Sequence, residues 1–165
     1  MTAPPVRFRD RSITLGNGSV GENIDIPSAS PKNYHQVLSP AADMARIALD
    51  GKRFLPPDFA RGPLPQVVVV PGSLGIAASH LAHAETITGA GIAALVLDPP
   101  GARGIGSTAG DQTQFSFAAS AYDVLAAWQA LASRAEIDRS CLGRRGTVAA
   151  GRPSRRRRHA VLPIA

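Results

Sequence analysis

The sequence predicts an α/β fold, in which parallel strands are joined by helices that cover the sheet. Residues 67–70 are four consecutive valines, and residues 92–97 form a second uninterrupted apolar run. Runs of this kind are typical of strands that are buried on both faces. A segment with helical character follows each run, over residues 79–89 and 114–133. Strand, helix and strand in this order predict right-handed crossovers between parallel strands.

The first 55 residues predict less regular structure. Residues 44–55 resemble a strand–turn–strand hairpin with Asp50-Gly51 at the turn, ended by Pro56-Pro57. Residues 1–33 are rich in Gly, Asn, Ser and Pro, which predicts an irregular arm with one short strand near 13–15. The expected organisation is therefore an irregular arm over 1–33, an α/β domain over 34–140 and a basic tail over 141–165.

The composition limits the class of protein. The chain has 165 residues, 44% of them hydrophobic, which suits one domain with a real core. It contains no apolar run of membrane-spanning length and no apolar segment near its start that resembles a secretory signal. A single cysteine, Cys141, excludes an internal disulfide framework. We therefore expect a cytoplasmic protein without a membrane partner.

The positive net charge belongs to one end of the chain. Seven of the 18 Lys and Arg residues are arginines in residues 141–165, where no acid occurs. The other 11 are balanced by 12 Asp and Glu in residues 1–140. A nucleic-acid partner is thus expected only through this tail, which predicts disorder because like charges repel. No third apolar strand follows Ile137-Asp138, so residues 67–70 are expected to be left as an exposed sheet edge.

A glycine-containing loop, Pro71-Gly72-Ser73-Leu74-Gly75, follows the first buried strand. Backbone N–H groups in such a loop are able to form an oxyanion hole, which stabilises the negative oxygen of an acyl-transfer intermediate. Phosphate binding is a weaker alternative, because the loop lacks the lysine of a P-loop and the Gly-x-Gly-x-x-Gly pattern. An ordinary strand-to-helix turn explains the loop equally well.

Other polar residues have simple structural explanations. His80 and His83 lie three residues apart on the predicted helix with Glu85 nearby, but no further metal ligand is evident, so no metal site is expected. Asp98 ends a strand, where it is placed either for catalysis or, more simply, to cap the Pro-Pro-Gly turn. Asp123 is expected on the helix surface. No cofactor is expected.

The order of several segments resembles the dienelactone-hydrolase-like branch of the α/β-hydrolase superfamily. The resemblance covers about residues 35–139, and the matching segments are 54–57, 67–75, 80–85, 97–104 and 111–117. It implies a partial α/β-hydrolase fold and a parent reaction in which an ester or lactone is hydrolysed by a nucleophile–His–acid triad. It also implies that Gly72, Ser73 and Leu74 form the oxyanion loop, with one backbone N–H from Leu74 or Ser73.

The triad itself is not recognisable in this sequence. The superfamily places its nucleophile in a Gly-x-Ser-x-Gly turn that is followed by an acid and then a histidine. No such motif occurs here; Ser154 lies between proline and arginines, and His159 follows it too closely to be the triad histidine. We therefore assign no catalytic residue, and we expect the chain as printed to be inactive.

The codons of residues 146–151 suggest how the motif was lost. Gly-Thr-Val-Ala-Ala-Gly, translated one nucleotide earlier, is compatible with Gly-His-Ser-Arg-Gly-Gly, which is a nucleophile motif. The sequence is thus interpreted as a truncated hydrolase that is frameshifted from about residue 140. The alternative is a small non-enzymatic α/β module whose basic tail binds nucleic acid or an acidic partner.

Overall fold

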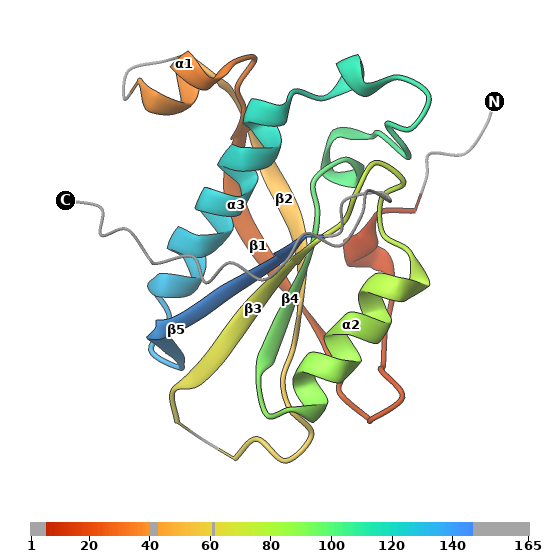
Figure 1. The fold of residues 1–165 in the computed structure, drawn as a ribbon, viewed down its shortest axis with the longest axis vertical. Coiled ribbons are helices and arrows are strands. Elements are labelled where there is room, and N and C mark those ends of the chain that lie inside the picture. Colours follow the sequence, from red (N-terminus) through yellow and green to blue (C-terminus); the bar gives the residue numbers. More distant parts are fainter. Residues whose placement is uncertain (1–5, 40–42, 61, 147–165) are drawn as a thin grey trace, which may run out of the picture.

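A computed structural model describes residues 6–39, 43–60 and 62–146, which form one five-stranded sheet with helices on both faces (Figure 1). The strands are β1 (Gly21–Ser30), β2 (Ala45–Phe54), β3 (Leu64–Val70), β4 (Ala93–Asp98) and β5 (Ile137–Gly146). The helices are α1 (Tyr34–Leu38), α2 (Ala78–Gly89) and α3 (Phe117–Ala132), with short 3-10 turns η1 (Phe8–Asp10), η2 (Gly101–Arg103) and η3 (Gln112–Gln114).

The strand order is β1-β2-β4-β3-β5, and β3 pairs in parallel with both β4 and β5. The two crossovers, through α2 and α3, pass over opposite faces of the sheet (Figure 1). The α/β prediction and the two buried strands are therefore confirmed, as are the helices, which begin and end within a few residues of the predicted limits. Among the described residues, no helix has the length and apolar character needed to cross a membrane.

Alternating side chains of the central strands build two cores. Val68, Leu95 and Leu97 face α3 and pack with Leu131, whereas Val69, Ala94 and Val96 face α2 and pack with Phe8 and Phe54. All six strand residues are fully buried. Because both faces of β3 and β4 are covered, an uninterrupted apolar sequence was the correct sign of these strands.

The predicted hairpin at Asp50-Gly51 is wrong, because both residues lie within the continuous strand β2. Gly51 is needed for close packing: a Cβ atom there would lie 3.1 Å from Leu95 Cδ1 and 3.2 Å from Ile26 Cδ1. Asp50 is buried and paired with Arg7. The dipeptide that suggested an exposed turn instead combines a glycine that leaves room for neighbouring side chains with a buried carboxylate.

The N-terminal arm is more regular than predicted, because β1 occupies its second half and pairs with the whole length of β2. Its inward side chains Ile24 and Ile26 belong to the core beneath α3. Near the expected short strand, only an isolated bridge between Thr14 and Val20 forms. The short alternation around Ile24 and Ile26 was the overlooked signal of a half-buried strand.

The prediction that a third parallel strand is missing is also wrong. Strand β5 runs beside β3 from Ile137 to Gly146, with one register shift between Leu64 and Gln66. The valine strand is therefore not a sheet edge, and residues 141–146 of the predicted tail belong to the sheet. The predicted disorder of the remaining tail concerns residues 147–165, which lie outside the described residues.

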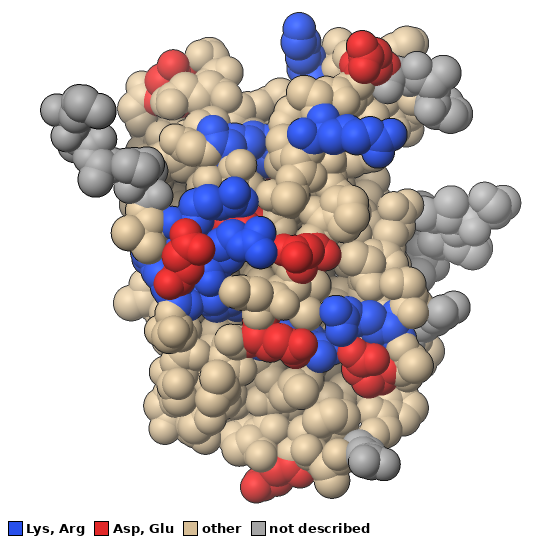
Figure 2. Space-filling view, turned by 180° about the vertical axis from the view of Figure 1, so that it is seen from behind, with Lys and Arg blue, Asp and Glu red and all other residues tan. Residues whose placement is uncertain are grey.

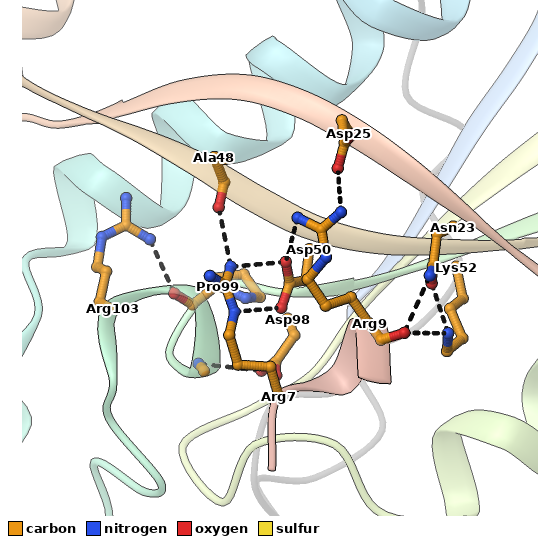
Figure 3. A network of polar contacts seen from close by, with 11 residues as sticks. Arg7, Arg9, Asn23, Asp25, Ala48, Asp50, Lys52, Asp98, Pro99 and Arg103 are labelled. Carbon is orange, nitrogen blue, oxygen red and sulfur yellow. Dashed lines mark hydrogen bonds and ion pairs between the residues drawn. The ribbon is translucent and has the colours of Figure 1, made fainter. Parts of the chain in front are cut away.

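Charged groups hold the N-terminal segment around Arg7 and Arg9 against β1 and β2 (Figure 3). Arg7 donates through two nitrogens to Asp50, at 2.7 and 3.0 Å, and Arg9 pairs with Asp25 at 3.0 Å. The buried Lys52 ammonium donates to Asn23 and to the carbonyl of Arg9, and burial lowers its pKa. This segment thereby covers the face of the sheet on which α2 packs.

Asp123 is buried rather than on the surface of α3, which corrects the sequence expectation. It accepts two hydrogen bonds from Arg103, at 2.7 and 3.1 Å, and one from Ser28 Oγ. Burial raises the pKa of Asp123, while the Arg103 guanidinium opposes that rise. The buried face of α3 is otherwise mostly alanine, and the larger apolar side chains of Phe117 and Leu125 are exposed.

Replacing Asp123 by asparagine should lower the free energy of unfolding by about 3 kcal/mol, because the Arg103 charge stays buried without its counterion. Urea denaturation followed by circular dichroism measures this loss. Asp25→Asn is the matched control: Asp25 pairs with Arg9 but its side chain is 73% exposed, so its loss should stay below about 1 kcal/mol. Equal losses in the two variants would contradict the role given to the buried pair.

Glu136 should make stability depend on acid pH. Hydrogen bonds from Arg53, from its own backbone and from Arg134 lower the pKa of Glu136 to about 2, below its ordinary 4.5. A carboxyl with a lowered folded-state pKa stabilises the fold above pH 4.5, and this contribution is lost as the pH falls toward 2. Denaturation across this range should show a shallower pH dependence for Glu136→Gln than for the unchanged chain.

Candidate functional site

The candidate site lies outside the carboxyl ends of β3 and β4, on the side of the sheet where α3 begins. A pocket of about 430 Å³ opens there; it is lined by Pro71, Gly72, Ser73, Pro99, Pro100, Thr108, Gln112, Phe115, Phe117 and Ser120. The crossovers that leave β3 and β4 run to opposite faces of the sheet. Open α/β sheets bind ligands outside the carboxyl ends of two neighbouring strands whose crossovers run to opposite faces. The pocket lies at this position.

The loop after β3 is held in one shape by the loop after β4. Ser73 O accepts hydrogen bonds from Thr108 N at 2.7 Å and from the hydroxyl groups of Ser107 and Thr108. Gly75 N donates to Gly72 O at 3.0 Å, and Gly75 has φ +71°, a left-handed conformation that favours glycine. The backbone N–H groups of Ser73 and Leu74 donate to no acceptor within the described part of the chain.

The three loop residues singled out from the sequence do not all face the same space. Gly72 and Ser73 line the larger pocket. Leu74 lies on the other side of the loop, where it lines a smaller pocket of about 120 Å³ together with Arg7, Arg11 and Asp98. The loop therefore separates the two pockets, and its peptide groups run between them.

Asp98 lies in the smaller pocket rather than in the larger one. Its Oδ1 accepts from Gly101 N at 3.1 Å, so it caps the turn that follows β4, as the simpler expectation held. Asp50 is its register partner on β2, and burial raises the pKa of Asp98. Arg7, which binds Asp50, keeps a positive charge beside these two carboxylates (Figure 3).

The histidines of α2 do not assemble a metal site with other ligands. His80 is buried and its Nδ1 accepts from Ala77 N at 2.9 Å, which caps the start of the helix. Glu85 lies against the N-terminal loop, and its carbonyl accepts from Asn17. Within the residues that the structure describes, no group of three or more His, Cys, Asp or Glu side chains is arranged to hold a metal ion.

Phe115 and Arg103 shape one wall of the larger pocket, and sequence reasoning missed both. The Arg103 guanidinium lies 4.7 Å from the centre of the Phe115 ring and donates to Pro99 O at 2.8 Å. Phe115 and Pro99, the two residues that Arg103 contacts here, line the pocket. The signal available in the sequence was an arginine two residues after the Asp-Pro-Pro-Gly turn, which follows a buried strand.

Charges on the opposite side of the molecule are mixed in sign. In Figure 2, lysines and arginines lie next to aspartates and glutamates, in one large cluster and in smaller groups. Ion pairs among the described residues include those of Arg53 with Glu22 and Glu136. This face therefore shows no uninterrupted basic stripe of the kind that binds nucleic acid.

Comparisons with known proteins find similarity in structure only. No protein-family model and no curated protein matches the chain. A dienelactone hydrolase-like promiscuous phosphotriesterase from metagenomic libraries matches with a TM-score of 0.52 and 21% identity, over 76% of this chain and 48% of that one. An acetyl xylan esterase from Paenibacillus sp. R4 matches with a TM-score of 0.53 and 18% identity, over 82% and 44% of the two chains.

The chain spans about half the length of these solved proteins. Structural similarity at these identities shows the fold alone, and the central β3 with its parallel neighbours on both sides agrees with it. The chain therefore has a partial α/β-hydrolase fold.

Proposed function

We propose that the chain is the N-terminal part of a dienelactone-hydrolase-like enzyme whose parent reaction is the hydrolysis of an ester or lactone. One observation carries the proposal: the loop after β3 borders a pocket and leaves the N–H groups of Ser73 and Leu74 without a described acceptor. One of these donors, together with the backbone N–H of the residue after the nucleophile, would stabilise the oxyanion that forms when the nucleophile attacks a carbonyl carbon. We propose Gly72, Ser73 and Leu74 as this oxyanion loop.

The position of β5 supports the same reaction. In the proposed mechanism, a serine or cysteine after β5 attacks the substrate carbonyl, a histidine takes its proton, and water later releases the acid. Gly146, the last residue of β5, is the register partner of Val70 on β3. A nucleophile in the turn that follows Gly146 would thus lie beside the loop that begins at Pro71.

We further propose that a frameshift explains the missing triad. In the alternative frame, the serine codon falls at position 148, two residues after the end of β5. This is the place where the superfamily carries its nucleophile. The frameshift then affects the sheet less than the sequence suggested, because β5 still pairs with β3 along its length. We propose that the parent enzyme is cytoplasmic.

A second candidate function rests on the seven arginines among residues 141–165. As a basic arm, this segment would bind nucleic acid or an acidic partner with strong salt dependence. Binding that disappears when residues 147–165 are deleted would favour this function over the frameshift. Stop codons soon after codon 151 in the alternative frame would favour it as well.

The chain as printed should hydrolyse p-nitrophenyl acetate and a simple lactone at the background rate. Loss of nucleophile and histidine removes on the order of a million-fold in rate from a serine hydrolase. Inserting one nucleotide near codon 140 and extending the gene to its natural end should restore hydrolysis. The control is the restored gene with alanine at codon 148, which should be inactive. Hydrolysis by the printed chain, or an inactive restored enzyme, would contradict the proposed function.

The shape of the oxyanion loop should depend on Gly75. An alanine there would adopt a left-handed conformation, and its Cβ would lie 3.1 Å from Gly106 O. Gly75→Ala should therefore lower the free energy of unfolding by about 1–2 kcal/mol. Gly106→Ala is the matched control, because nothing lies within 4 Å of the Cβ position. Thermal denaturation of both variants checks this, and an unaffected Gly75→Ala protein would show that the loop is not constrained.

A further inference from the structure

We infer that the larger pocket selects an uncharged ester or lactone with an aromatic or bulky apolar group, and rejects substrates that carry a carboxylate there. The inference rests on the proposed function for the reaction, but it concerns only what the pocket binds. The described residues that line it are prolines, phenylalanines, a glycine and neutral polar residues; none is charged. Its volume of about 430 Å³ lies within the usual range for small-molecule sites.

Arg103 lies behind the aromatic wall, but its charge is already satisfied. Its nitrogens donate to the Asp123 carboxylate, to Ser30 Oγ and to the carbonyls of Ala29 and Pro99. The face of the guanidinium is covered by the Phe115 ring, and only 9% of the side chain is exposed. A carboxylate in the pocket would therefore lose its water without gaining a cation.

A neutral carbonyl substrate has both a hydrogen-bond donor and apolar surface at this pocket. The N–H group of Ser73 or Leu74, in the loop that borders this pocket, is the donor proposed for its oxygen, and Phe115 and Phe117 supply aromatic surface. Phe117 is 71% exposed although it begins a helix beside the pocket, so its ring is available for contact with a ligand. Burial of apolar ligand surface against these rings favours binding, whereas burial of an unpaired charge opposes it.

The test compares two ligands of nearly equal shape with the printed chain. One is the neutral ketone 4-phenylbutan-2-one, and the other is the anion 3-phenylpropanoate. Titrations at pH 7, followed by amide NMR shifts, should give a Kd at least tenfold lower for the ketone, with shifts at Ser73, Thr108 and Ser120. Equal or tighter binding of the anion, shifts located elsewhere, or no binding of the ketone up to its solubility limit would overturn the inference.

A charged variant tests the cause of the preference. Gln112 lines the pocket and is exposed on η3, so Gln112→Arg adds a free cation there. This variant should bind 3-phenylpropanoate more tightly and reduce the preference for the ketone. Leu125→Arg is the control, since it adds the same charge to an exposed position two turns along α3. An equal effect of both variants would mean that net charge, rather than the pocket, governs binding.

The outcome is separable from that of the proposed function. If the restored enzyme hydrolyses no ester while the printed chain still prefers the ketone, the function fails and the pocket assignment stands. If the restored enzyme is active but the printed chain binds the anion equally well, the function stands and the inference fails.

Discussion

The buried ion pair between Arg103 and Asp123 is the interaction on which the arrangement around the pocket depends. It joins three parts of the chain that are distant in sequence: strand β1 through Ser28 and Ser30, the turn after β4 through Pro99, and helix α3. Removing both charges from water is costly, and good geometry with every polar atom satisfied offsets that cost. A pair built in this way restricts α3 to one position on the sheet, and this position places Phe115 against the pocket.

Charge pairing also shapes the other face, but there a half-exposed arginine pairs with a buried carboxylate. Asp50 and Asp98 are register partners on neighbouring strands, so two carboxylates share one side of the sheet. Arg7 binds Asp50 from the N-terminal segment, which also packs Phe8 into the core beside α2. The charges and the apolar contact act together, since the arginine compensates a buried carboxylate only while the segment stays in place.

Sequence reasoning succeeded where one physical signal dominated. The valine run and the apolar run before Asp98 became β3 and β4 because burial on both faces requires apolar residues at every position. It failed where tertiary contacts decided. Gly51 is small because Leu95 and Ile26 crowd it, which no local pattern reveals. Asp123 is buried because it pairs with Arg103, which lies twenty residues earlier in the chain and so outside any local pattern. The role of the loop at Gly72 and Ser73 stays a prediction, and the aromatic wall was recognised only from the contacts of Arg103.

The parallel pairing of β3 with β5 has a consequence for the order of folding. Val67 and Gly143 are partners in the sheet, yet the whole of β4 and both long helices lie between them in the chain. Closing so long a loop costs entropy before any contact repays it, so this pairing belongs to the late steps of folding. Until then β3 has an unpaired side, and on the ribosome β5 is also the last of the five strands to emerge. Chaperone demand and aggregation during synthesis should therefore be greatest in the interval before β5 is in place.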